Sequence, residues 1–134
     1  RNVSKLYVPK TYNFNAFFEA IYSWNPIINQ AKYANNYDYN KAVYLMSLYQ
    51  LLENGFLILK EDTSLSSPIA TLFYERYENG EKINEELESR KDEIQCVVSK
   101  DVLETEIPFG QTQQPKLWDY ADNVDTLTFL IEKV

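Results

Sequence analysis

Hydrophobic and polar positions alternate along the first residues of the chain and then change to a helical spacing. The alternation covers residues 3–8 and stops at Pro9, which predicts a β-strand. Asn13 or Asn15 can cap a helix after it, because a short polar side chain accepts hydrogen bonds from the free N–H groups of a first turn. The helix ends or kinks at Asn25-Pro26. Its predicted inner face is strongly aromatic: Phe14, Phe17, Phe18, Ile21 and Tyr22.

A polar segment and a second helix are predicted next. Residues 33–39 alternate Tyr with Asn and Asp, which favours a loop. Asp38 can cap a helix that runs from there to about Leu52, with Asn54-Gly55 as its C-cap. The predicted core stripe of this helix is Ala42, Val43, Met46 and Tyr49, flanked by Leu45, Leu48 and Leu52.

Three further strands are predicted in the second half. Residues 56–60 form a nearly continuous apolar run, as in a buried parallel strand. A Ser-rich loop over 61–68 leads to a strand over 69–77, and another strand is predicted over 94–98.

Two more helices complete the predicted elements. Residues 81–91 predict a short charged helix, with Ile83 and Leu87 facing inward. Residues 125–134 predict a closing helix with Leu127, Leu130 and Ile131 inward. Strands separated by helices favour a layered α/β fold, a mainly parallel sheet with flanking helices. We expect residues 1–134 to form a single domain.

Between the last strand and the closing helix lies an unusual bend, Pro108-Phe109-Gly110-Gln111. Proline fixes φ and glycine permits φ > 0, so the backbone sets the direction of the Phe109 ring. Glutamines follow at positions 111, 113 and 114. A rigid bend with a ring at its tip and amides beside it indicates a surface that contacts a ligand.

Composition narrows the function classes. The net charge is −7, and residues 61–134 carry −10 while residues 1–60 carry +3. An acidic surface repels phosphate backbones, which argues against a nucleic-acid partner. No apolar run reaches the roughly 18 residues of a membrane span.

One cysteine cannot form an internal disulfide, which fits a cytoplasmic protein. The chain begins with Arg1 rather than Met, so we expect a processed protein or a segment of a longer one.

Few side chains point to catalysis within this chain. Histidine is absent, which excludes Ser-His-Asp and Cys-His nucleophiles and leaves only a carboxylate-rich zinc site. Cys96 is a candidate thiolate nucleophile, but a buried hydrophobic role is favoured. A second candidate set is a general acid/base pair, against which ordinary turn chemistry is weighed: Glu61, Asp62, Glu75 and Glu78. A third set could stack on an adenine or simply cover helix faces: Tyr33, Tyr37, Tyr39, Tyr44 and Tyr49.

Four stretches together resemble the C-terminal part of the long-chain fatty acyl-CoA reductases, a branch of the aldehyde dehydrogenase superfamily. Residues 2–9 resemble the strand that follows the family's catalytic cysteine. Residues 55–74, with Ser67-Pro68-Ile69, resemble the superfamily's strand-loop-strand around its Gly-Pro-Val. Ser67 stands in place of the Gly, and Ser64 and Ser66 stand in place of the superfamily's Glu and the Phe that follows it. Residues 94–101 resemble the superfamily's strand that ends in a small residue, Val and Ser/Thr-x-Asp. Residues 107–113 and 125–130 resemble the superfamily's closing Pro-Phe-Gly segment and its last helix.

The resemblance implies an NAD(P)H-dependent parent enzyme that reduces an acyl-CoA to a fatty aldehyde, in which this chain is a C-terminal segment of the catalytic domain. The parent would bind NADP or NAD mostly outside this segment, and its nucleophilic cysteine and Gly-rich dinucleotide turn would lie before Arg1. The implied substrate or cofactor contacts are Pro108, Phe109, Gly110, Gln111, Ser66 and Ser67. The segment alone is expected to be inactive, and a homo-oligomer is left open. The competing reading is a non-enzymatic α/β interaction module whose aromatic helices bind a partner.

Overall fold

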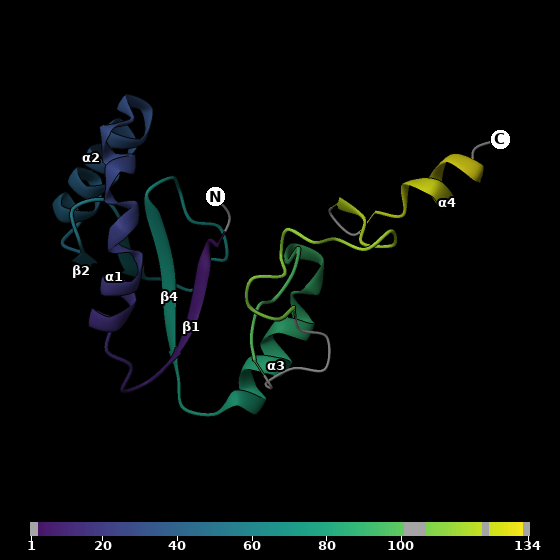
Figure 1. Cartoon of the computed structure of the whole chain (residues 1–134). Coiled ribbons are helices and arrows are strands. Elements are labelled where there is room, and N and C mark those ends of the chain that lie inside the picture. The colour runs from purple at the N-terminus through teal and green to yellow at the C-terminus, as the bar shows by residue number, and fades with distance from the viewer. Residues whose placement is uncertain (1–2, 101–106, 122–123, 133–134) are drawn as a thin grey trace. The chain divides into compact units, whose positions relative to one another are not determined.

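A computed structural model describes residues 3–100, 107–121 and 124–132 of the chain (Figure 1). The chain divides into two compact units, Arg1–Glu78 and Asn79–Val134. Each unit is described by itself below.

The first unit is built on a four-stranded sheet in the order β1-β4-β3-β2. Strands β1 (Lys5–Pro9), β4 (Thr71–Tyr77) and β3 (Ile58–Glu61) run parallel, and β2 (Leu51–Glu53) pairs antiparallel with β3. Three of the four predicted strands are therefore present, and the layered, mainly parallel α/β class is confirmed. Strand β2 was not predicted.

Helices cover both faces of this sheet. Helix α1 (Asn15–Ile21) packs with Phe17 and Phe18 against β-strand side chains that include Leu59 and Val8. The 3-10 helix η1 (Tyr22–Asn29) then leads to α2 (Ala31–Met46), which packs on Ile58, the neighbour of Leu59 in β3. Because successive strand residues point to opposite faces, α1 and α2 lie on opposite faces of the sheet, and Figure 1 shows α1 in front and α2 behind.

Helix α2 begins earlier than the sequence predicted. Residues 33–39, expected to form a loop, are helical, and Asp38 lies inside the helix rather than at its cap. The physical reason is a stripe of side chains at helical spacing that faces the sheet: Tyr33, Tyr37, Asn40 and Tyr44. Buried Asn40 donates from Nδ2 to the carbonyl oxygen of Ile69 at 2.9 Å. Burial of one face therefore stabilises a helix that polar composition alone disfavours.

Helix α2 also ends earlier than predicted, at Met46, with a Schellman motif. The N–H of Tyr49 donates to the carbonyl of Tyr44, and the N–H of Leu48 donates to the carbonyl of Leu45, both at 3.0 Å. The left-handed position of this motif is occupied by Leu48, with φ 59°, rather than by glycine. The Tyr44 and Tyr49 rings meet edge to face, 6.1 Å apart between centroids, which is the side-chain contact that accompanies the motif.

Asn54-Gly55 closes the β2–β3 hairpin, so the predicted helix C-cap is wrong. The Asn54 side-chain oxygen accepts from the N–H groups of Phe56 and Leu57, at 3.3 and 3.0 Å. Gly55 supplies φ +90°. The same residues serve either kind of turn. Because α2 ends at Met46, Asn54-Gly55 lies in the β2–β3 turn and not at the end of a helix.

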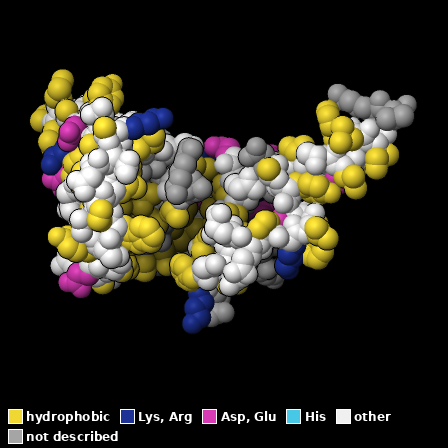
Figure 2. Space-filling model, turned by 45° about the horizontal axis from the view of Figure 1, so that its top comes forward, with side chains coloured by type: hydrophobic (Ala, Val, Ile, Leu, Met, Phe, Trp, Pro, Cys, Tyr) yellow, Lys and Arg dark blue, Asp and Glu magenta, His cyan; other side chains and the backbone are white. Residues whose placement is uncertain are grey.

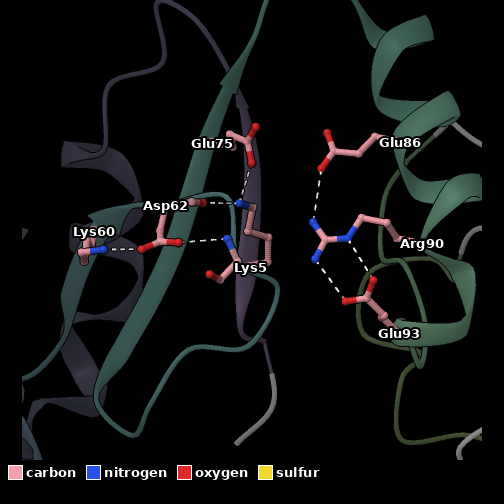
Figure 3. Close-up of polar contacts among 8 residues, drawn as sticks. Lys5, Lys60, Asp62, Glu75, Glu86, Arg90 and Glu93 are labelled. Atoms are coloured by element: carbon pink, nitrogen blue, oxygen red, sulfur yellow. Dashed lines mark hydrogen bonds and ion pairs between the residues drawn. The ribbon is translucent and has the colours of Figure 1, made fainter.

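In the second unit, helix α3 (Gly80–Ser89) confirms the predicted charged helix, with Asn79 as its cap and Ile83 buried. Arg90 then bonds Glu86 and Glu93 on either side, as Figure 3 shows. The predicted strand over 94–98 is wrong. The 3-10 helix η2 (Lys91–Glu93) precedes an irregular segment in which an isolated β-bridge joins Val98 to Ile107.

The closing helix of the second unit is shorter than predicted. It is α4 (Thr126–Ile131), capped by the Asp125 side chain, which accepts from the N–H of Thr128 at 2.9 Å. The inward face predicted for it is wrong, because these side chains are exposed: Leu127, Leu130 and Ile131. Figure 2 shows hydrophobic side chains along the segment that ends in α4.

Replacing Leu48 with glycine should stabilise the protein. Leu48 is almost fully exposed, at 90%, so its side chain contributes little packing. A left-handed residue with a Cβ costs roughly 1 kcal/mol, which glycine avoids. Urea denaturation should therefore give Leu48→Gly an unfolding free energy about 1 kcal/mol higher. Leu48→Ala is the matched control, because it removes the side chain and keeps the strain. Equal stability of the two variants would contradict the prediction.

Candidate functional site

The predicted ligand contacts fall in two places, one in each unit. Ser66 and Ser67 lie in the β3–β4 loop, residues 62–70, which joins two adjacent parallel strands. Pro108, Phe109, Gly110 and Gln111 lie in the second unit. The structure therefore brings the members of each group together, and we describe the two groups separately.

The second half of the β3–β4 loop is held by hydrogen bonds to its neighbours. The Ser67 hydroxyl donates to the carbonyl oxygen of Thr71 at 2.7 Å, and the N–H of Thr71 donates back to the carbonyl oxygen of Pro68 at 3.1 Å. Ala70 takes a left-handed conformation with φ 63° and is buried. Ser66 is exposed. The loop thus has a fixed base and presents Ser66 to solvent.

Two buried lysines hold the first residue of this loop. Lys60 donates to the Asp62 carboxylate, and Lys5 donates to the Asp62 backbone carbonyl and, at 2.6 Å, to Glu75 Oε2 (Figure 3). Each lysine side chain is only 6% exposed. Both pair in register with Phe73, so they stand in one row across β1, β4 and β3. Sequence reasoning missed these lysines. The only indication in the sequence was that Lys60 ends an apolar run and is followed two residues later by Asp62.

Three aromatic rings surround the Lys60 ammonium group. Its Nζ lies 4.1 Å from the centroid of the Tyr49 ring, 5.2 Å from Phe73 and 5.3 Å from Tyr44. We call these three residues the aromatic cage. The negative faces of the rings attract a cation and partly replace the water that burial removes. Tyr44 and Tyr49 come from the Schellman motif of α2, so the end of that helix builds the cage.

Three of the four carboxylates proposed for an acid/base pair are paired with lysines in the structure, and the fourth, Glu61, is exposed at the end of β3. Asp62 bonds Lys60, Glu75 bonds Lys5, and exposed Glu78 bonds exposed Lys10. The hydrogen bond from Lys60, followed by one from the Ser64 backbone, lowers the pKa of Asp62 to about 2. A carboxylate with so low a pKa is a poor general base and is not protonated near neutrality. Asp62 therefore acts as an anchor of the loop.

The tyrosines at 33–49 were considered either as rings that stack on an adenine or as rings that cover packing surfaces. In the structure most of them pack against the sheet. The Tyr33 hydroxyl donates to the carbonyl oxygen of Phe56 at 2.9 Å, and the buried Tyr37 hydroxyl donates to Glu53. Burial, reinforced by the bond to Glu53, raises the pKa of Tyr37. Tyr39 is exposed. Most of these rings are therefore fixed in packing against β-strands and the β2–β3 hairpin.

The Pro108-Phe109-Gly110-Gln111 segment is the bend that the sequence predicted. The N–H of Gln111 donates to the carbonyl oxygen of Pro108 at 3.1 Å, closing a β-turn in which Gly110 has φ +81°. The Phe109 ring is 71% exposed at the tip of this turn. A turn of this kind holds a large apolar ring in solvent, where it can contact another molecule.

Cys96 is exposed, so the prediction that it is a buried hydrophobe is wrong. That prediction depended on a strand over 94–98, and the structure has none there. Without the alternation of a strand, nothing directs the thiol to a core.

Within the described ranges 3–100, 107–121 and 124–132, no group of three or more His, Cys, Asp or Glu side chains is placed to hold a metal ion. In that same part of the chain, no helix has the length and apolar character needed to cross a membrane.

Comparisons of the chain with protein-family models, with curated proteins and with solved structures found no match.

The Lys60–Asp62 pair should make stability depend on pH at the acid end. The pKa of Asp62 is about 2 in the folded protein, below its ordinary value near 4, so the stabilisation is complete above about pH 5 and is lost as pH falls toward 2. The shift corresponds to on the order of 2 kcal/mol.

The measurement is the unfolding free energy by urea between pH 2 and pH 7. The loss of stability of the wild type between pH 5 and pH 2 should exceed that of Asp62→Asn by on the order of 2 kcal/mol. The variant should be less stable at pH 7, because Lys60 is left buried without its partner. An equal acid loss in both proteins would show that Asp62 does not carry the effect.

Proposed function

We propose that this chain is the C-terminal catalytic-domain segment of an NAD(P)H-dependent acyl-CoA reductase, which converts an acyl-CoA to a fatty aldehyde. The observation that carries the proposal is the connection of two parallel, adjacent strands, β3 and β4, through a loop that contains Ser67-Pro68-Ile69. This is the strand-loop-strand arrangement that the resemblance implies for that segment. The resembling stretches also occur in the expected order along the chain, although residues 94–98 do not form the strand that the resemblance implies.

The chemistry of such a reaction divides between this segment and the parent enzyme. Reduction of a thioester through an acyl-enzyme needs a reactive thiolate and a nicotinamide that delivers hydride. The only cysteine of the sequence is Cys96, and its only glycines, at 55, 80 and 110, do not form a Gly-x-Gly-x-x-Gly turn. We therefore assign the nucleophile and most of the NADP or NAD contacts to the parent, outside these residues.

In this proposal, each unit of the segment supplies its own contacts to the ligands of the parent enzyme. The β3–β4 loop follows a parallel strand, where α/β folds commonly bind ligands, and presents Ser66, while the Ser67 hydroxyl beside it supports the loop through Thr71. The 108–111 turn presents the Phe109 ring and the Gln111 amide. The parent would take an acyl-CoA as substrate, and the single cysteine favours a cytoplasmic location.

A non-enzymatic interaction module is the second candidate. The observation that favours it is the set of large hydrophobic side chains exposed in both units, visible in Figure 2. In the first unit they include Trp24, Tyr39, Met46 and Leu48, and in the second Leu117, Trp118, Phe129 and Leu130. Such side chains can equally be covered by the rest of the parent enzyme. A protein from the complete gene that binds neither NADPH nor an acyl-CoA would favour the module.

The isolated 134-residue chain should reduce no acyl-CoA, whereas the protein encoded by the complete gene should. The reason is that this sequence lacks both an activated thiol and a Gly-rich dinucleotide turn. The measurement is NADPH and NADH oxidation at 340 nm with acyl-CoAs of several chain lengths. Turnover by the purified chain would contradict its assignment as an inactive segment. No turnover by the complete protein would contradict the reductase.

Phe109→Ala should lower kcat/KM of the complete enzyme more than it lowers stability. An exposed ring held by a rigid turn contributes little to folding but can position substrate or cofactor. We expect a decrease in kcat/KM on the order of tenfold or more, with an unfolding free energy within about 0.5 kcal/mol of wild type.

The matched control is Phe129→Ala, which removes a half-exposed ring from α4 in the same unit. It should leave kcat/KM close to the wild-type value. An unchanged kcat/KM in Phe109→Ala would remove the 108–111 turn from the proposed site.

A further inference from the structure

We propose that Lys60 is a positioning residue: it sets the conformation of residues 63–66 of the β3–β4 loop through Asp62, and thereby places Ser66, beside the separately anchored Ser67, for contact with the nicotinamide cofactor. The effect on cofactor binding rests on the proposed function. The effect on the loop does not, since it follows from contacts within the first unit.

The first step is that the Lys60 ammonium group has a fixed place. Its Nζ is held by the aromatic cage on one side and by the Asp62 carboxylate on the other. The cage combines Phe73 of β4 with Tyr44 and Tyr49 at the C-terminal end of α2. A cation with contacts to a neighbouring strand, a helix end and a loop carboxylate has little freedom to move, so it is a rigid point from which to hold a loop.

The second step is that Asp62 transmits this position to the loop backbone. One carboxylate oxygen, Oδ2, binds Lys60, and the other, Oδ1, accepts the N–H of Ser64 at 2.9 Å. The Asp62 N–H donates to the carbonyl of Tyr74 at 3.1 Å, and its carbonyl accepts from Lys5. Three directional bonds beside the ion pair therefore fix the first turn of the loop, two residues before Ser66.

The third step is that the far end of the loop is fixed separately. Asn40 of α2 holds the carbonyl of Ile69, and Ser67 holds the carbonyl of Thr71. Between these two anchored ends lies the short stretch that contains Ser66. Loss of the first anchor should therefore alter residues 63–66 while residues 69–71 keep their bonds.

The choice of lysine at position 60 supports a positioning role. A neighbouring buried residue of β3, Leu59, is aliphatic, as a core strand requires. Replacing a buried ion pair with apolar residues is often neutral or stabilising, so stability alone does not favour a lysine here. A charged side chain adds a directional bond to one carboxylate, that of Asp62, and this bond fixes the conformation of the loop.

The first measurement is amide hydrogen exchange on the complete protein, comparing wild type with Lys60→Met. Methionine keeps the length and the apolar packing of the side chain and removes the charge. Exchange at Ser64 and its neighbours up to residue 66 should become about tenfold faster, as expected for loss of a hydrogen-bonded anchor, while β4 amides keep their protection.

Two further variants keep the test decisive. Lys10→Met is the matched control, because it removes the lysine of an exposed ion pair with Glu78 and should leave loop exchange unchanged. Lys60→Met with Asp62→Asn removes both charges together, so it should fold even if the single variant does not, and it should show the same fast exchange. Wild-type exchange in the loop of the double variant would overturn the proposal.

The second measurement separates positioning from general stability. In steady-state kinetics, Lys60→Met should raise KM for NADPH about tenfold and change kcat less. Fast loop exchange with an unchanged KM for NADPH would overturn the cofactor role. A wild-type complete protein without reductase activity would contradict the proposed function, and the exchange result would then decide the loop-setting role by itself.

Discussion

The ammonium group of Lys60 is the point on which the first unit depends. It lies where β3, β4, the end of α2 and the β3–β4 loop meet, between the aromatic cage and the Asp62 carboxylate. A buried cation is costly unless every side of it is occupied by a partner. Helix α2 must therefore end where Tyr44 and Tyr49 can reach Lys60, and the loop must begin with Asp62 beside it.

This constraint links the local chemistry of a helix end to the candidate site. The Schellman motif brings Tyr49 back beside Tyr44, and it does so with Leu48 in a conformation that glycine prefers. Lys60 in turn orders a loop that carries the seryl side chains of the proposed cofactor contact. The second unit contributes its proposed part independently, since the Phe109 turn is closed by its own backbone hydrogen bond.

Strands and short-range turns were the features that sequence patterns predicted best. The alternation before Pro9, the apolar run that ends at Lys60 and the segment that ends at Tyr77 each gave a strand of the sheet. The Pro108-Phe109-Gly110 bend was also predicted, because proline and glycine fix backbone angles locally. The strand predicted around Cys96 failed because, among the described residues, pairing of this short apolar run is limited to the isolated bridge between Val98 and Ile107, which is too little to form a strand.

The sequence by itself determined the α/β class, the parallel strands and the exposed ring of Phe109, because periodicity and turn chemistry act between near neighbours. Only the tertiary structure decided that residues 33–39 are helical, that Asn54-Gly55 closes a hairpin, and that Lys60 and Lys5 are buried and paired. Each of these depends on groups far apart in the chain: tyrosines against a sheet, a helix end against a strand, a lysine of β1 against a carbonyl 57 residues later. Burial and ion pairing join such groups only after the chain has folded, so local patterns do not predict them.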